Sequence, residues 1–267
     1  VLGSESLLIE ILAMLSVILI LASVGLVDDL LGWQRGGLKI RHRLALAALA
    51  AVPLVVINAG KSDIGLPFVG VVDAGLIYPI ILIPIGIVGA TTTFNLLAGF
   101  NGLEAGQGIL LLSAMALVAI FTGNPWLAVV ALCMIAALLA FLFYNFYPAK
   151  VFPGDSLTYG VGGLLATIAI LGNFEKIAVF FFIPYIMETA LKLRGKLIKQ
   201  SFGLPKNDGT LDLKYDNIYS LNHLAIIFMK KAGIRATEKK AVYLIWSFQI
   251  LIIVIGLLIF RRGVFGI

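Results

Sequence analysis

Oxygen-bearing side chains stand at the ends of long apolar runs in three separate segments of the chain. They are carboxylates and carboxamides: Asp28, Asp29, Asn95, Asn101, Glu104 and Asp155. Such oxygens are the hard ligands that Mg²⁺ prefers, and Mg²⁺ usually completes its coordination with waters and substrate phosphates. Lysines and arginines nearby would hold the phosphate oxygens. The pattern therefore predicts a magnesium-assisted phosphoryl-transfer site.

The segments that must position these residues are membrane spans. Of 267 residues, 61% are hydrophobic and only 13% are charged, with a mean hydropathy of +1.06. A soluble domain is about 25% charged, so soluble, disordered and nucleic-acid-binding classes are excluded. A helix crosses a bilayer in about 20 residues. Runs of this kind lie at 7–27, 44–58, 76–94, 107–122, 126–147, 157–172, 176–192 and 242–260. We therefore expect an all-α polytopic membrane protein with about eight transmembrane helices.

The distribution of Lys and Arg predicts the orientation of these spans. Of the 20 Lys and Arg residues, 16 fall in one set of alternate loops and four in the other. The basic set comprises 28–43, 95–106, 148–156 and 193–241. The positive-inside rule places this set in the cytoplasm. The same loops carry the carboxylates and amides, so the candidate site is expected on the cytoplasmic face.

We expect one integral membrane catalytic domain over 1–267. The polar segment 193–241 is predicted to be a cytoplasmic subdomain within it. There, Asn207-Asp208-Gly209 is a turn signal between Leu204 and Leu211, which predicts a small hairpin. Residues 221–227 are typical of an amphipathic segment at the membrane surface. The single cysteine, Cys133, excludes an intrachain disulfide framework.

Each motif also has a plain structural interpretation. Asp28 and Asp29 could be interfacial charges, and the asparagines with Gly99 could form only a turn. Asp155 alone is better explained as the N-cap of the next helix, and most cations of 193–241 as contacts to lipid headgroups. Convergence on one face favours the functional interpretation.

Three strings then identify a resemblance. Residues 27–31 with 40–43, FNLLAGFNGLEAGQ at 94–107 and YNFYPAKVFPGD at 144–155 occur in the order and spacing of one superfamily. They closely resemble the polyprenyl-phosphate N-acetylhexosamine-1-phosphate transferases. Within it, the chain is most similar to the dolichyl-phosphate GlcNAc-1-phosphotransferase branch of eukaryotes and archaea. Its compact loops favour an archaeal member, and hence the cell membrane.

The resemblance implies transfer of GlcNAc-1-phosphate from UDP-GlcNAc to a polyprenyl or dolichyl phosphate, the first step of N-glycan assembly. It implies Mg²⁺ as cofactor, with Mn²⁺ as an alternative, inhibition by tunicamycin, and no nucleic-acid partner; a homodimer is a further expectation. Asp155 and Asn95 resemble the metal ligands, and Asp28 and Asp29 the aspartates that position or deprotonate the lipid phosphate. The remaining substrate-binding candidates are Asn101, Gly99, Glu104, Phe152, Arg43, Lys39, Arg194, Lys199 and Lys206.

In that family, Asn101 and Gly99 match the contacts to uracil, and Phe152 matches the aromatic ring that stacks on it. Arg43 stands where relatives have a phosphate-contacting lysine, with Lys39 or Arg41 as alternatives.

Two departures from the family pattern matter. The family normally has ten spans, so about two helices before Val1 are expected to be missing here. The basic string of the last cytoplasmic loop is replaced by residues 200–206, which leaves the cation for the sugar pyrophosphate open among Arg194, Lys196, Lys199 and Lys206, with His223 behind them. Another UDP-N-acetyl sugar as donor, or a secondary transporter, are the alternative functions.

Overall fold

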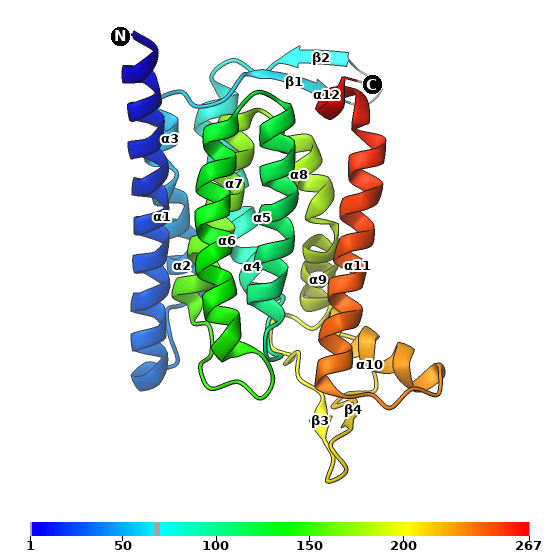
Figure 1. The fold of residues 1–267 in the computed structure, drawn as a ribbon. Coiled ribbons are helices and arrows are strands. Elements are labelled where there is room, and N and C mark those ends of the chain that lie inside the picture. Colours follow the sequence, from blue (N-terminus) through cyan, green and yellow to red (C-terminus); the bar gives the residue numbers. More distant parts are fainter. Residues whose placement is uncertain (1, 67–69, 267) are drawn as a thin grey trace. The chain divides into compact units, whose positions relative to one another are not determined.

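The computed structural model describes residues 2–66 and 70–266, which form two compact units. The first unit comprises Val1–Thr92 with Gly154–Glu175, and the second Thr93–Pro153 with Lys176–Ile267. Both are built almost entirely of helices, with two short hairpins (Figure 1). The predicted all-α class is therefore confirmed. The single catalytic domain over 1–267 stays a prediction.

Six of the described helical segments are long and apolar enough to cross a membrane. They are α1 (Leu2–Arg35), the π-helix η1 (Tyr78–Leu82) continued by α4 (Ile83–Leu96), α5 (Leu103–Phe121), α6 (Pro125–Asn145), α7 (Asp155–Gly172) and α11 (Glu238–Ile259). Each coincides with one of the predicted apolar runs. The chain is thus an integral, multi-pass membrane protein.

The other two predicted runs are each divided into two shorter helices. The run 44–58 becomes α2 (Ile40–Ala50) and α3 (Val52–Val56), and the run 176–192 becomes α8 (Glu175–Phe181) and α9 (Ile183–Arg194). Pro53 and Pro184 lie in the first turn of α3 and α9. Proline lacks an N–H and suits the start of a helix better than its interior. Of the about eight continuous spans expected, six are therefore long enough to cross a membrane in the part of the chain that the structure describes.

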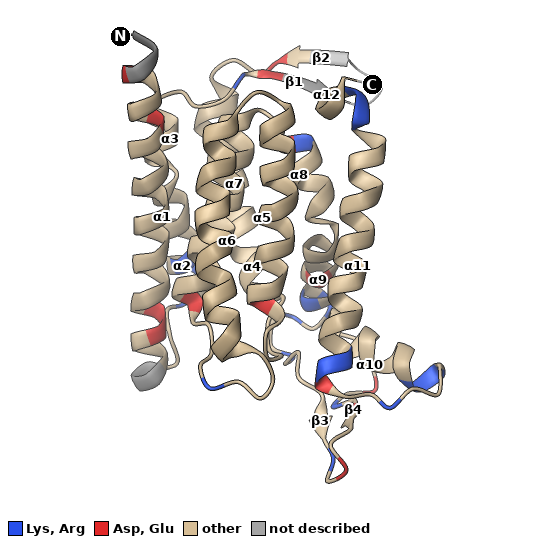
Figure 2. Cartoon of the chain, in the orientation of Figure 1, with Lys and Arg blue, Asp and Glu red and all other residues tan. Residues whose placement is uncertain are grey.

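In the first unit, α1 and α7 pack closely and antiparallel. A Cβ added to Gly25 would lie 2.3 Å from the Asp155 carbonyl oxygen, and one added to Gly163 would lie 2.2 Å from the Leu21 side chain. Small residues allow this close approach between membrane helices. The packing brings the end of α1 to the start of α7, where acidic segments gather in Figure 2. Strands β1 (Asp63–Leu66) and β2 (Gly70–Asp73) pair antiparallel near the other end of these helices (Figure 1).

In the second unit, α5 packs against α6 and α11. The predicted hairpin is confirmed: β3 (Leu204–Pro205) pairs antiparallel with β4 (Leu211–Asp212). The predicted amphipathic segment is a helix, α10 (Leu221–Lys231), whose Ala225 and Ile226 are buried while Phe228 is exposed. Helix α12 (Arg261–Phe265) ends the unit.

A tight contact between α5 and α11 gives a test of this packing. A Cβ on Gly106 would lie 1.9 Å from the Trp246 ring, a separation that real side chains do not adopt. Gly106→Ala should therefore destabilise the protein by about 1–3 kcal/mol, the usual effect of overpacking. Thermal unfolding in detergent measures this as a lower Tm. Gly89→Ala is the matched control, because no heavy atom lies within 4 Å of its added Cβ. Equal Tm values for Gly106→Ala and Gly89→Ala would contradict this packing. Adding Trp246→Leu to Gly106→Ala should restore the Tm, because the smaller side chain makes room for the added methyl group.

Candidate active site

Asp28 anchors a loop and a cation at the end of α1. Asp28 is 3% exposed, and one of its carboxylate oxygens accepts a hydrogen bond from the Leu38 backbone N–H. The other oxygen lies 2.8 Å from Nη2 of Arg43, which also donates through Nε to the Leu38 carbonyl oxygen over 3.0 Å. Gly37 makes this turn with φ +82°, and a Cβ there would lie 2.8 Å from Asp28 Oδ1. The loop, the aspartate and the arginine therefore form one fixed group.

Asp29 uses its carboxylate differently. Its Oδ1 accepts from the Asp155 backbone N–H at 2.8 Å, and its Oδ2 accepts from the Ser156 N–H at 3.1 Å. Gly154 is the N-cap residue of α7 and offers no side chain for capping. The interpretation of Asp155 as the N-cap is therefore wrong, because Asp155 is the first residue of the helix proper.

The Asp155 side chain completes the cluster. Asp155 Oδ2 lies 3.5 Å from Arg43 Nη1, and the Asp155 carboxyl group is within hydrogen-bonding reach of Asp28. Two carboxylates, those of Asp28 and Asp155, thus converge on the Arg43 guanidinium. Two carboxylates so close together repel one another unless a proton or a cation lies between them, so the donor set suits an added divalent cation. Sequence reasoning missed Tyr159, which is buried one turn after Asp155 with its hydroxyl within reach of Arg43; the i, i+4 spacing was the available signal.

The three aspartates are not a ready three-ligand cage. In the part of the chain that the structure describes, no group of three or more His, Cys, Asp or Glu side chains is placed to hold one metal ion. Mg²⁺ commonly uses only one or two protein carboxylates together with waters and substrate phosphates, so the residues fit such an ion with Asp155 as a ligand. Asn95 lies in the last turn of α4, in the second unit. Its partnership with Asp155 stays a prediction.

The second unit holds the glycine-rich turn 97–102 between α4 and α5. Gly99 and Gly102 have φ values of +117° and +83°, a region open to glycine. Backbone N–H groups of this turn donate to side chains of other segments: Gly99 to Glu104 at 3.0 Å, Asn101 to Glu238 at 2.6 Å, and Gly102 to Asn145 at 3.1 Å. Of the sequence-predicted residues, Gly99 and Asn101 therefore lie in this turn, and Glu104 contacts it from the first turn of α5.

Two aromatic side chains of the second unit differ in their surroundings. The predicted base-stacking residue, Phe152, is 70% exposed, so its ring is accessible to a ligand. Phe202 was not predicted, yet its ring packs on Gly99, where an added Cβ would lie 2.7 Å from a ring carbon. The string that carries Phe202 departs from the family pattern, so the resemblance gave no signal for it.

The three predicted cations of segment 193–241 already have partners. Lys206 lies 2.7 Å from Asp212, which also contacts Lys230, and these bonds lower the pKa of the Asp212 carboxyl. Arg194 donates to Asn217 at 3.3 Å, and the Lys199 ammonium lies 4.8 Å from the centre of the Tyr215 ring. Lys39 is exposed and precedes α2. Lys206 thus stabilises the hairpin, whereas Arg194 and Lys199 have weaker, exposed partners.

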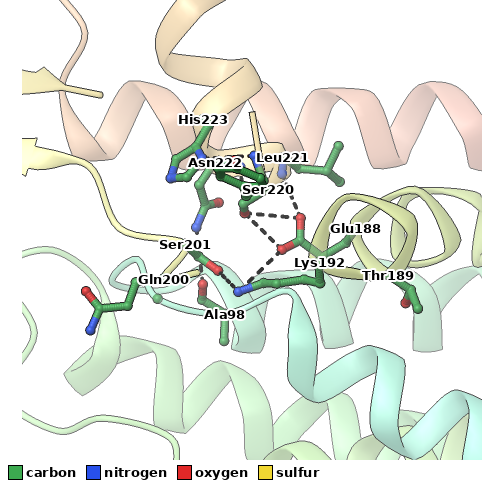
Figure 3. A network of polar contacts seen from close by, with 12 residues as sticks. Ala98, Glu188, Thr189, Lys192, Gln200, Ser201, Ser220, Leu221, Asn222 and His223 are labelled. Atoms are coloured by element: carbon green, nitrogen blue, oxygen red, sulfur yellow. Dashed lines mark hydrogen bonds and ion pairs between the residues drawn. The ribbon is translucent and has the colours of Figure 1, made fainter. Parts of the chain in front are cut away.

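A buried polar network holds α10 against α9 (Figure 3). The Glu188 carboxylate is fully buried and accepts from the Ser220 hydroxyl at 2.9 Å and the Leu221 N–H at 2.6 Å. Lys192 lies 3.9 Å from Glu188 and donates to the Ser201 hydroxyl.

The next residue of α10 after Leu221 is Asn222, whose amide donates to the Ala98 carbonyl oxygen at 3.1 Å. The network therefore reaches the glycine-rich turn.

His223 lies beside this network and is buried. Its Nδ1 accepts a hydrogen bond from the Tyr219 N–H at 3.2 Å. Burial lowers the pKa of its imidazole, because the charged form loses its hydration. A neutral, buried imidazole is poorly suited to hold an anionic pyrophosphate, so the structural interpretation of His223 is favoured.

Comparison with known proteins gives one family. The profile described as glycosyl transferase family 4 matches residues 11–173. A relative from the archaeon Saccharolobus solfataricus is 36% identical over 90% of this chain and 72% of its own length; its provisional name is UDP-N-acetylglucosamine–dolichyl-phosphate N-acetylglucosaminephosphotransferase. A Dictyostelium discoideum protein of that name is 32% identical over 66% of this chain and 50% of its own. A phospho-N-acetylmuramoyl-pentapeptide-transferase from Lacticaseibacillus paracasei is 31% identical over 69% of this chain and 61% of its own.

Proposed function

The chain belongs to glycosyl transferase family 4, and from this membership we propose that it transfers GlcNAc-1-phosphate from UDP-GlcNAc to a dolichyl-type polyprenyl phosphate. The products are UMP and GlcNAc-pyrophosphoryl-polyprenol, the first lipid-linked intermediate of N-glycan assembly. The names of the archaeal and Dictyostelium relatives support this donor and acceptor. The observation that carries the proposal is the cluster of Asp28, Asp155 and Arg43 at the end of two membrane helices.

The reaction forms a bond between an oxygen of the lipid phosphate and the sugar-bearing phosphorus of the donor. The bond from that phosphorus to the bridging oxygen breaks, and UMP leaves with the electron pair. The second pKa of a phosphate monoester is about 6, so the nucleophile is already ionised near neutral pH. Catalysis then needs alignment of two anions and neutralisation of their charge more than it needs a strong base.

The chain's residues divide this work. Mg²⁺, when bound, would neutralise the pyrophosphate oxygens, and we propose Asp155 and Asn95 as its protein ligands. Arg43, held by Asp28, would bind the phosphate of the lipid acceptor through its guanidinium. The turn 97–102, with Phe152, would bind the uridine. The 16 basic residues in one set of loops support a cytoplasmic site.

Release of UMP by the purified full-length protein tests this proposal. We expect release with UDP-GlcNAc and a polyprenyl phosphate in the presence of Mg²⁺. Omission of the lipid, or chelation with EDTA, should reduce release to background. Silence with every UDP-sugar would overturn the enzymatic proposal and favour transport.

A different donor sugar is the second candidate. The bacterial relative is named for transfer of a phospho-N-acetylmuramoyl-pentapeptide and is 31% identical to this chain, so relatives with different donors are similar in sequence. Competition among UDP-GlcNAc, UDP-GalNAc and a UDP-diacetamido sugar in the same assay decides between them. If UMP is released only with a UDP-sugar other than UDP-GlcNAc, the proposed reaction type stands and the donor, and with it the pathway, is a different one.

A further inference from the structure

We propose that Asp29 is a positioning residue that caps α7 from the neighbouring helix and thereby fixes Asp155, while Asp28 and Arg43 face the substrate phosphates. The inference deepens the proposed function and rests on it for the identity of the reaction. It assigns different tasks to two adjacent aspartates that the sequence presents as a pair.

The first argument is the use of both carboxylate oxygens of Asp29. They accept from two consecutive N–H groups, those of Asp155 and Ser156, at 2.8 and 3.1 Å. The first N–H groups of a helix have no partner within the helix. A capping residue normally supplies an oxygen from the helix's own N-cap position. Here that position is Gly154, so the oxygens come from α1 instead.

The second argument is that the surroundings are shaped for this contact. A Cβ on Gly154 would lie 2.1 Å from Asp29 Oδ2, so the absent side chain is what admits the carboxylate. The Ser156 hydroxyl donates to the Ala22 carbonyl oxygen at 3.0 Å, which ties the same turn of α7 to α1 a second time. Asp29 is therefore held between two helices, and its proton-accepting oxygens are already occupied.

The third argument is the contrast with Asp28. Asp28 accepts from only one backbone N–H, that of Leu38, and its other oxygen lies 2.8 Å from Arg43 Nη2; the same guanidinium reaches Asp155. Asp28 therefore belongs to the charged group that would meet the phosphates. Asp29 meets backbone N–H groups and contributes by holding the Asp155 main chain in place. Residues that orient a metal ligand typically change metal affinity or activity by about 10- to 100-fold when removed.

An exchange of caps tests the proposal. In the native chain, Gly154→Ser introduces a side chain into the space of Asp29 and should lower the Tm. Asp29→Ala should also lower the Tm, by about 2–8 °C for the loss of one cap in a chain of this size. In the double variant, the introduced serine can cap α7 locally, because Gly154 has the extended φ of −83° and ψ of −177° found at N-caps. The double variant should therefore melt above either single variant.

Kinetics separate positioning from proton transfer. For Asp29→Ala, we expect the Mg²⁺ concentration for half-maximal UMP release to rise about 10-fold or more, and the double variant to recover most of this loss. The pH profile of kcat should keep its shape in the double variant. If the double variant melts like the native protein but stays inactive, Asp29 acts as a base and the proposal is overturned. The proposal would also be overturned if the Tm loss of the double variant equalled the sum of the losses of Gly154→Ser and Asp29→Ala.

The unfolding measurements stand apart from the reaction. If the native protein releases no UMP, the proposed function fails, while recovery of the Tm in the double variant still tests the cap. Asp216→Ala is the matched control, because it removes one exposed aspartate of the second unit. It should melt like the native protein.

Discussion

Exchange of Asp155 for asparagine should reduce magnesium-dependent UMP release by at least about a hundredfold, the usual effect of removing one preorganised electrostatic contact from an active site. An amide keeps the size of the side chain but loses the negative charge that a divalent cation requires. UMP release measured over a range of Mg²⁺ concentrations should show that added metal does not restore the rate.

The fold should survive this substitution. Arg43 keeps its stronger partner, Asp28, at 2.8 Å, and the backbone N–H of Asp155 keeps its acceptor, Asp29. Asp63→Asn is the matched control, because Asp63 is an exposed residue of the hairpin near the other end of α1 and α7. It should release UMP at the native rate. Native activity in Asp155→Asn would remove Asp155 from the proposed metal site.

The sequence predicted those parts of the fold that depend on local physics. Spans follow from apolar length, and the hairpin follows from Asn207-Asp208-Gly209, where Gly209 adopts φ +76°. The run 44–58 was predicted as one span from its apolar length alone, but the structure divides it into α2 and α3. In the structure, α3 begins at Val52 after Ala51, and Pro53 lies in its first turn.

The candidate site was predicted by residue type but not by role. Asp28 and Asp29 are adjacent on one helix, so their side chains point about 100° apart, and only the neighbouring helix decides what each meets. Likewise the turn 97–102 is held by Asn145, Asn222 and Glu238, which come from 43 to 137 residues away in sequence. No local pattern identifies such partners, because each polar side chain has many compatible acceptors and donors.

Removal of Glu188 should have the largest effect on stability. Glu188→Ala leaves the Ser220 hydroxyl and the Leu221 N–H without their buried acceptor, and Lys192 without its carboxylate. Breaking one side of a buried ion pair costs about 3–5 kcal/mol. For a chain of this size that lowers the Tm by roughly 10 °C. Thermal unfolding in detergent measures this directly.

The same change should weaken nucleotide binding through the Asn222 amide. That amide holds the Ala98 carbonyl beside the glycine-rich turn, and α10 is fixed by Glu188 at its first residues. A rise in KM for the UDP-sugar larger than the fall in kcat is therefore expected, both for Glu188→Ala and for Asn222→Ala. Asn222→Ala leaves the Glu188 network in place and should cost far less stability. Glu188→Gln with Lys192→Met removes both charges and should melt above Glu188→Ala, because no unpaired buried ion remains. An unchanged KM in all of these variants would separate the network from the turn and leave it a purely structural support of α10.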